Sequence, residues 1–155
     1  MERAPITREY RIISEPRGVA YENLLAFCSE VGAWCSLVDL SPKVKSSKAF
    51  LAKAKDYAIG VDQVVNWPGG KASKGTVALW RYALSAEFVS LLIDSAPGLF
   101  GWRSPKLPED LAVYRRNGSV LLGSIAHEHI GWMHLSEDEV HARLLGPVEL
   151  RQERS

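Results

Sequence analysis

The stretch of sequence that decides the fold is LAVYRRNGSVLLGSIAHEHIGWMHL, residues 111–135. Asn117-Gly118 is typical of a two-residue type I′ turn, because both positions of that turn need a positive φ. A second short turn is expected near Glu128 and His129. Each turn is flanked by short runs of β-branched, aromatic and aliphatic residues, which favour strands, at residues 111–116, 119–126 and 130–135. The stretch therefore predicts an antiparallel three-stranded meander.

Other strands are expected upstream of the meander. The runs with strand composition are residues 10–14, 34–40 and 76–84. Residues 64–75, which include Asn66-Trp67-Pro68-Gly69, have the composition of a surface loop. Residues 99–108 are expected to form a connector packed onto the body of the protein, whereas residues 148–155 are expected to fray.

Helices are expected between these strands. Apolar residues recur at helical spacing after Tyr21 and after Ser85. A third helix is expected to begin at a Ser46 cap, with an apolar stripe that extends to Val61. Ser136 and Glu139 match a capping box, so a final helix is predicted from there to Gly146. Strands and helices in this order predict a single α+β domain over residues 1–155, a mostly antiparallel sheet with helices packed on it.

The composition indicates an ordinary globular protein. The chain has 155 residues, of which 46% are hydrophobic and 24% charged, as in ordinary globular proteins. No apolar run approaches the length of a membrane span, and the first twenty residues contain no apolar signal segment, so we expect a cytoplasmic protein. Cys28 and Cys35 lack a Cys-x-x-Cys spacing and are expected to be two buried thiols.

His127-Glu128-His129 is one candidate for chemistry. Two histidines two positions apart on a strand project from one face and can share a metal ion. No further ligand follows at a metal-binding spacing, so the favoured interpretation is a hydrogen-bonded strand end followed by an exposed turn. Glu109 and Asp110 are adjacent, and adjacent side chains rarely face each other; a turn-capping or edge-protecting role is expected for them.

Charge is unevenly distributed. The chain has 19 basic and 18 acidic residues, a net charge of +1, which argues against a dedicated polyanion binder. Residues 41–75 nevertheless carry seven lysines against two aspartates. Trp67 and Trp102 lie in the connectors rich in Pro and Gly, where such rings either cover the edge of a core or anchor a partner.

Four pieces of the sequence, taken in order, are similar to segments of a known group of proteins. They are Asn66-Trp67-Pro68-Gly69, Trp80-Arg81-Tyr82, Leu107-Pro108-Glu109-Asp110-Leu111 with Tyr114-Arg115 and Gly118, and Ser124-Ile125-Ala126-His127-Glu128. Together they resemble small stand-alone bacterial proteins of unassigned function. The resemblance covers about the C-terminal half and implies a single α+β domain. It also implies that the Trp67 loop and the His127-Glu128 strand end are features of the group, and it implies no activity.

The resulting hypothesis is a non-enzymatic binding protein of the bacterial cytoplasm, of the immunity or partner-neutralising kind, that acts on another protein by charge and shape complementarity. No catalytic residue, metal ligand or cofactor is assigned. The alternative is a small metal-dependent or hydrolytic enzyme that uses His127, Glu128 and His129, assisted by Glu109 or Asp110. Nucleic-acid binding by the lysines is a third possibility, disfavoured because few aromatic residues accompany them. The expected contact residues are Trp67, Trp102, Lys43, Lys48, Lys55, His127 and Glu128.

Overall fold

The computed structural model describes residues 6–40 and 45–153, and side chains from residue 47 onward in the second range. Its helices are α1 (Val19–Val31), α2 (Lys45–Ala54), α3 (Ala86–Ser95) and α4 (Glu137–Val140), with 3-10 turns η1 (Lys55–Tyr57), η2 (Leu99–Gly101), η3 (Ala126–Glu128) and η4 (Arg143–Leu145). Its strands are β1 (Arg8–Ile12), β2 (Trp34–Asp39), β3 (Ala58–Val64), β4 (Asn66–Trp67), β5 (Gly70–Lys71), β6 (Val77–Ala83), β7 (Glu109–Tyr114), β8 (Val120–Ile125), β9 (Ile130–Leu135) and β10 (Leu150–Gln152).

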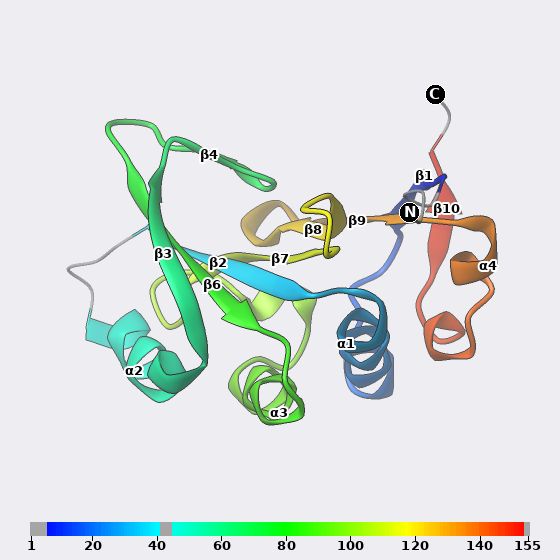
Figure 1. Cartoon of the computed structure of the whole chain (residues 1–155), viewed down its shortest axis with the longest axis horizontal. Coiled ribbons are helices and arrows are strands. Elements are labelled where there is room, and N and C mark those ends of the chain that lie inside the picture. The colour runs from blue at the N-terminus through cyan, green and yellow to red at the C-terminus, as the bar shows by residue number, and fades with distance from the viewer. Residues whose placement is uncertain (1–5, 41–44, 154–155) are drawn as a thin grey trace.

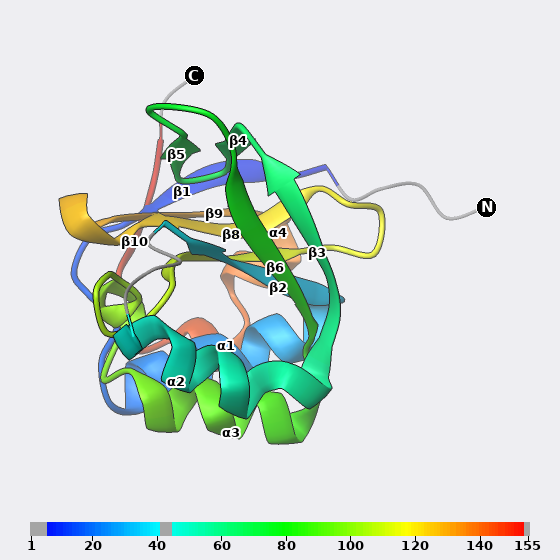
Figure 2. The same ribbon diagram turned by 90° about the vertical axis from the view of Figure 1, so that its left-hand side faces the viewer.

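Eight of the strands form one sheet in the order β10-β1-β9-β8-β7-β2-β6-β3, and each neighbouring pair is antiparallel. Helices α1, α2 and α3 cover one face of this sheet (Figure 1). The β4–β5 hairpin lies over the opposite face, as the turned view in Figure 2 also shows. The fold is therefore the predicted α+β arrangement of helices on a mostly antiparallel sheet.

The main core lies between the sheet and its three helices. Helix α1 contributes Leu24, Leu25 and Cys28, and α3 contributes Phe88 and Leu92, all buried at helical spacing. The facing strands contribute the buried side chains Cys35, Leu37, Tyr82, Leu111, Val113, Leu122 and Met133. Cys28 and Cys35 are free and buried, as predicted. Burial raises the pKa of Cys28 to about 12, so its thiol stays protonated and unreactive at neutral pH.

The predicted meander is confirmed as β7, β8 and β9, but its first turn differs from the expectation. Gly118 N donates to Arg115 O at 2.8 Å, and Arg115 N donates to Ser119 O at 2.8 Å. Gly118 has a φ of 89°, whereas Asn117 does not have a positive φ. The loop is therefore a type I turn followed by a left-handed glycine, and the two-residue type I′ prediction was wrong. The Asn117 side chain stabilises the turn by accepting a hydrogen bond from Ser119 N.

The segment after α2 is the largest departure from the predicted elements. The helix ends at Ala54 instead of reaching Val61, and β3 follows the turn η1. Strand β3 forms because Ile59, Val61 and Val64 are β-branched and the strand pairs along its length with β6. The expected loop at residues 64–75 contains the β4–β5 hairpin. The predicted cap, Ser46, lies outside the described side chains.

The C-terminal region also differs from the expectation. Helix α4 ends at Val140 and is followed by η4, so the predicted continuous helix to Gly146 was wrong. Residues 150–152 form β10 instead of fraying, because their backbone pairs with β1, with Tyr10 opposite Gln152. Within the described residues, no helix is long and apolar enough to cross a membrane.

The predicted capping box is confirmed, and Arg115 ties α4 to the meander. Ser136 Oγ accepts from Glu139 N, and a Glu139 oxygen accepts from Ser136 N. Arg115 Nη1 and Nη2 donate to the two Glu139 carboxylate oxygens at 2.9 and 2.6 Å. Arg115 Nη2 also donates to the His134 carbonyl oxygen. A bidentate pair with so little exposure orients the short helix against β9.

Replacing Glu139 by glutamine is expected to lower the free energy of unfolding by about 1–3 kcal/mol at neutral pH. Burial alone would raise the pKa of Glu139, but the hydrogen bonds from Arg115 and Ser136 and the Arg115 charge outweigh it and lower that pKa. A carboxyl group with a lowered folded-state pKa stabilises the protein above its unfolded pKa and loses that contribution as the pH falls through the folded value.

The stability difference between wild type and Glu139→Gln is therefore expected to narrow as the pH falls below about 4. Urea unfolding across a pH series measures it. Glu137→Gln, an exposed change in the same helix, is the control and is expected to stay within about 0.5 kcal/mol of wild type. A Glu139→Gln deficit that persists unchanged in acid would contradict this account.

Candidate functional site

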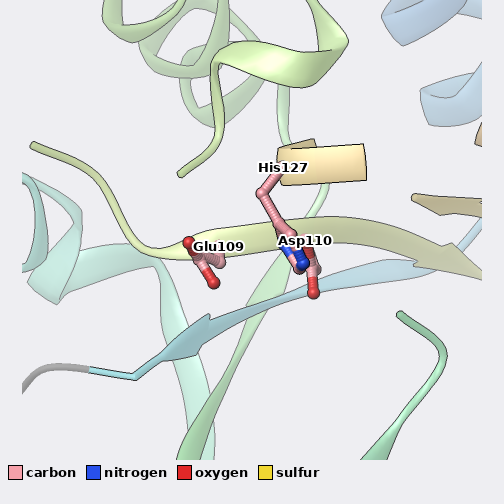
Figure 3. Close-up of side chains that lie close together, drawn as sticks. All are labelled: Glu109, Asp110 and His127. Atoms are coloured by element: carbon pink, nitrogen blue, oxygen red, sulfur yellow. The ribbon is translucent and has the colours of Figure 1, made fainter. Parts of the chain in front are cut away.

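Two carboxylates and an imidazole converge where β7 begins and β8 ends (Figure 3). Glu109 and Asp110 open β7, and His127 reaches them from η3, which directly follows β8. One potential ligand atom from each residue lies within 4.8 Å of the other two. Adjacent strand residues normally point to opposite faces, but Asp110 has a φ of 59°, which breaks that alternation. The expectation that Glu109 and Asp110 do not face a common site was therefore wrong.

Asp110 is held on two sides by hydrogen bonds. Its Oδ2 accepts from Trp67 Nε1 and its Oδ1 accepts from Ala126 N, both at 2.9 Å. Burial raises the pKa of Asp110, and these two hydrogen bonds and the nearby His127 partly oppose that rise. Because Trp67 lies in the β4–β5 hairpin, this one carboxylate joins the hairpin, β7 and η3. Its position explains why the hairpin stays against the sheet.

Gly69 allows the hairpin to approach this closely. A Cβ atom at Gly69 would lie 2.7 Å from Asp110 Oδ2 and would also collide with the Ser124 carbonyl oxygen. Glycine is therefore required at the tip of the hairpin by the nearness of the sheet backbone. The turn composition of residues 64–75 indicated a loop, but this contact with the start of β7 was not visible in the sequence.

Glu109 is the least compensated member of the cluster. The residue as a whole is only 7% exposed. Among the described residues, its carboxylate accepts one hydrogen bond, from Ser104 N to Oε1 at 3.1 Å. The cluster thus contains two buried carboxylates side by side, with one exposed imidazole next to them.

His127, Glu128 and His129 follow the strand end in an exposed turn, as the favoured interpretation expected, and do not form the pair of histidines on one strand face that the metal alternative required. Residues 126–128 form the turn η3, and His129 has a left-handed φ of 56°. The His129 ring lies 5.4 Å from the Phe100 ring, whereas His127 joins Glu109 and Asp110. The strand geometry of the metal alternative does not form because the chain turns as soon as β8 ends. His127 and Glu128 are both exposed, so a contact of these residues with a partner stays a prediction.

The two connector tryptophans have different environments. Trp102 is 0% exposed, donates from Nε1 to Tyr21 Oη at 2.8 Å and packs edge-on against Phe50. This burial favours the core-covering interpretation for Trp102 and leaves its ring no surface for a partner. Trp67 is half-buried and is fixed by Asp110, so it positions the hairpin.

A second candidate region is the free edge of the sheet at β3. This strand has a neighbour only on its β6 side within the described residues. Three aliphatic side chains in and just after it, Ile59, Val61 and Val65, are 52%, 46% and 54% exposed. Sequence reasoning missed this edge because Val61 was assigned to a helix; the alternation of Ile59, Val61 and the Val64-Val65 pair was the available signal.

Exposed lysines precede and follow this edge strand along the chain. Lys48 lies on α2 and Lys55 on η1, immediately before β3, and both are exposed as expected. Lys71 and Lys74, in and after β5, are exposed as well. Lys43 lies outside the described residues. Strand β3 with Val65 and the lysines Lys48, Lys53, Lys55, Lys71 and Lys74 are together termed the lysine edge.

Comparison with protein-family models, with curated proteins and with solved structures finds no match for this chain.

Proposed function

We propose that this is a non-enzymatic binding protein of the immunity or partner-neutralising kind, whose lysine edge pairs with an extended, acidic segment of another protein. The observation that carries the proposal is an edge strand with a neighbour on one side only, among the described residues, which combines exposed aliphatic side chains with exposed lysines in the segments before and after it.

An edge strand offers backbone donors and acceptors to another chain. Proteins normally protect such an edge with charges within the strand, with proline, or with a covering element, because an exposed apolar edge recruits other strands. Strand β3 contains no proline. Its one charged residue, Asp62, forms an ion pair with Arg81 at 2.9 Å. Added-strand recognition obtains affinity from backbone hydrogen bonds and specificity from alternate side chains, here Ile59 and Val61.

The lysines define the charge of the partner. Lys53 and Lys55 precede β3, and Lys71 and Lys74 follow it along the chain, whereas Asp62 is partly neutralised by Arg81. A positive border attracts an acidic strand, speeds its encounter and repels a basic one. Because these lysines are exposed, the attraction is expected to weaken as salt is added.

Replacing Val61 by glutamate is expected to weaken the binding of an acidic strand by at least about tenfold, which is about 1.4 kcal/mol. The new carboxylate removes an apolar contact and repels the ligand, while the exposed position leaves the core intact. The probe is a fluorescent peptide of alternating glutamate and valine, about ten residues long. Fluorescence anisotropy measures its affinity, and hydrogen exchange locates it.

Val19→Glu is the matched control, since Val19 is 65% exposed and lies on α1 away from the edge. This variant is expected to bind the peptide as wild type does, and peptide binding is expected to protect β3 amides. Equal affinity for wild type and Val61→Glu, or protection confined to other strands, contradicts the proposal. Protection, without peptide, of the β3 amides that do not bond to β6, accompanied by a dimer, identifies a second copy of the chain as the partner and overturns the acidic-segment proposal.

A metal-dependent hydrolytic enzyme is the second candidate. The convergence of Glu109, Asp110 and His127 supports this candidate, with these three residues as the metal ligands in place of His127, Glu128 and His129. In such an enzyme the three side chains would hold an ion, which would lower the pKa of a bound water. Hydrolysis of bis(p-nitrophenyl) phosphate in the presence of Mn²⁺ tests the activity. Turnover no faster than that of the metal salt alone, or equal for wild type and His127→Ala, removes this candidate.

A further inference from the structure

We infer that Glu109, Asp110 and His127 form a binding site for one divalent metal ion that accepts mixed oxygen and nitrogen ligands, with Zn²⁺ and Mn²⁺ as the representative ions. The three donor atoms lie within 4.8 Å of one another. Ligand atoms around one zinc ion lie about 4 Å apart or less, because each is about 2.0–2.2 Å from the metal. Closing the cluster onto an ion therefore requires side-chain movements of less than about 1 Å.

Glu109 also lacks a positively charged partner among the described side chains. Its residue is more than nine-tenths buried, and among the described residues its Oε2 accepts no hydrogen bond. In the same part of the chain, no lysine or arginine forms an ion pair with Glu109 or Asp110. Burying a carboxylate is costly unless it is paired, and two adjacent carboxylates add mutual repulsion. A bound cation would compensate both effects.

The hydrogen bonds to Asp110 match those of an oriented metal ligand. Donors from Trp67 and Ala126 hold one side of each oxygen. A carboxylate has about four lone-pair positions, so each Asp110 oxygen can still accept a further ligand. Carboxylates that ligate metals are usually fixed by such outer hydrogen bonds. The β4–β5 hairpin that carries Trp67 thereby becomes part of the site.

The donor types and exposure define the class of ion. Two carboxylates and one imidazole suit Zn²⁺ and Mn²⁺ better than Ca²⁺ or Mg²⁺, which prefer oxygen ligands alone. His127 is exposed while both carboxylates are buried, so the solvent side of the ion remains open to water or to another ligand. This inference is independent of the lysine edge. It supplies the ion that the hydrolytic alternative requires, and ion binding without hydrolysis would leave it intact while removing that alternative.

Isothermal titration of the full chain with ZnCl₂ and MnCl₂, after treatment with EDTA, tests the site. Wild type is expected to bind one ion per chain and to unfold at a higher temperature in its presence. His127→Ala removes an exposed ligand and is expected to reduce the affinity by more than about tenfold. His129→Asn is the matched control, because it alters the neighbouring exposed histidine outside the cluster and asparagine tolerates its left-handed backbone.

Glu109→Gln provides a second readout. It keeps the shape of the side chain and an oxygen for Ser104 N, but removes one buried negative charge. The metal-free variant is expected to unfold at a higher temperature than metal-free wild type and to lose the stabilisation by Zn²⁺. Binding of neither ion, or equal affinity for wild type and His127→Ala, would overturn the inference. Equal stabilisation of Glu109→Gln and wild type by Zn²⁺ would also overturn it.

Discussion

Replacing Trp102 by alanine is expected to lower the free energy of unfolding by about 3–5 kcal/mol, the range for large aromatic truncations in a core. The ring is fully buried, packs against Phe50 and donates a hydrogen bond to Tyr21. Truncation would leave a cavity and an unpaired Tyr21 hydroxyl acceptor, although that hydroxyl still donates to the Leu92 carbonyl. Urea unfolding followed by circular dichroism measures the loss.

Trp102→Phe separates the loss of ring volume from the loss of the hydrogen bond, and Trp67→Ala provides a comparison with the other connector tryptophan. Trp102→Phe keeps most of the ring volume and removes the donor, so it is expected to cost less than alanine. Trp67→Ala changes a half-buried ring and is expected to cost about 1–3 kcal/mol. A cost below about 1 kcal/mol for Trp102→Ala would contradict the placement of this ring in the core and would return it to the candidates for a partner contact.

Replacing Asp110 by alanine is expected to lower the free energy of unfolding by about 2–4 kcal/mol, from three changes at one position. The Trp67 indole N–H loses its acceptor, and so does the buried backbone N–H of Ala126. Alanine also adopts the left-handed φ of 59° less readily than aspartate. Relief of the repulsion with Glu109 offsets part of this cost.

Asp110→Asn is the matched variant. Asparagine tolerates the left-handed backbone and keeps one carbonyl acceptor, so it is expected to retain more stability than alanine does. The resonance of the Trp67 indole N–H reports directly on the hairpin: it is expected to exchange rapidly with solvent in Asp110→Ala and to remain partly protected in Asp110→Asn. Unchanged protection in Asp110→Ala would show that the hairpin is held by other contacts.

The elements that the sequence predicted correctly are those with strong local signals. The β7–β8–β9 meander follows from β-branched runs with turn residues between them, and the cap of α3 follows from Ser85, whose hydroxyl accepts from Phe88 N. The capping box of α4 was equally local. Each of these signals operates within a few residues, so the surrounding fold did not need to be known.

The errors at residues 58–64 and 150–152 occurred where distant residues decide the outcome. Residues 58–64 carry apolar residues compatible with a short buried helix, and pairing with β6 makes them a strand. Residues 150–152 have little strand signal, and the neighbouring β1 orders them as β10. The Asn117-Gly118 turn was assigned the wrong type because the residues involved, from Arg115 to Ser119, permit two loop lengths.

The sequence by itself determined the α+β class, the meander, the buried cysteines and the chemical types present near residues 109–129, because these depend on composition and on local periodicity. Only the tertiary structure decided which polar side chains meet. Asp110 accepts a hydrogen bond from Trp67, which lies 43 positions earlier in the chain. The left-handed backbone angle of Asp110 brings its carboxylate beside the Glu109 carboxylate and the His127 imidazole. Such contacts depend on how strands are ordered in the sheet, and strand order is set by the packing of the whole chain.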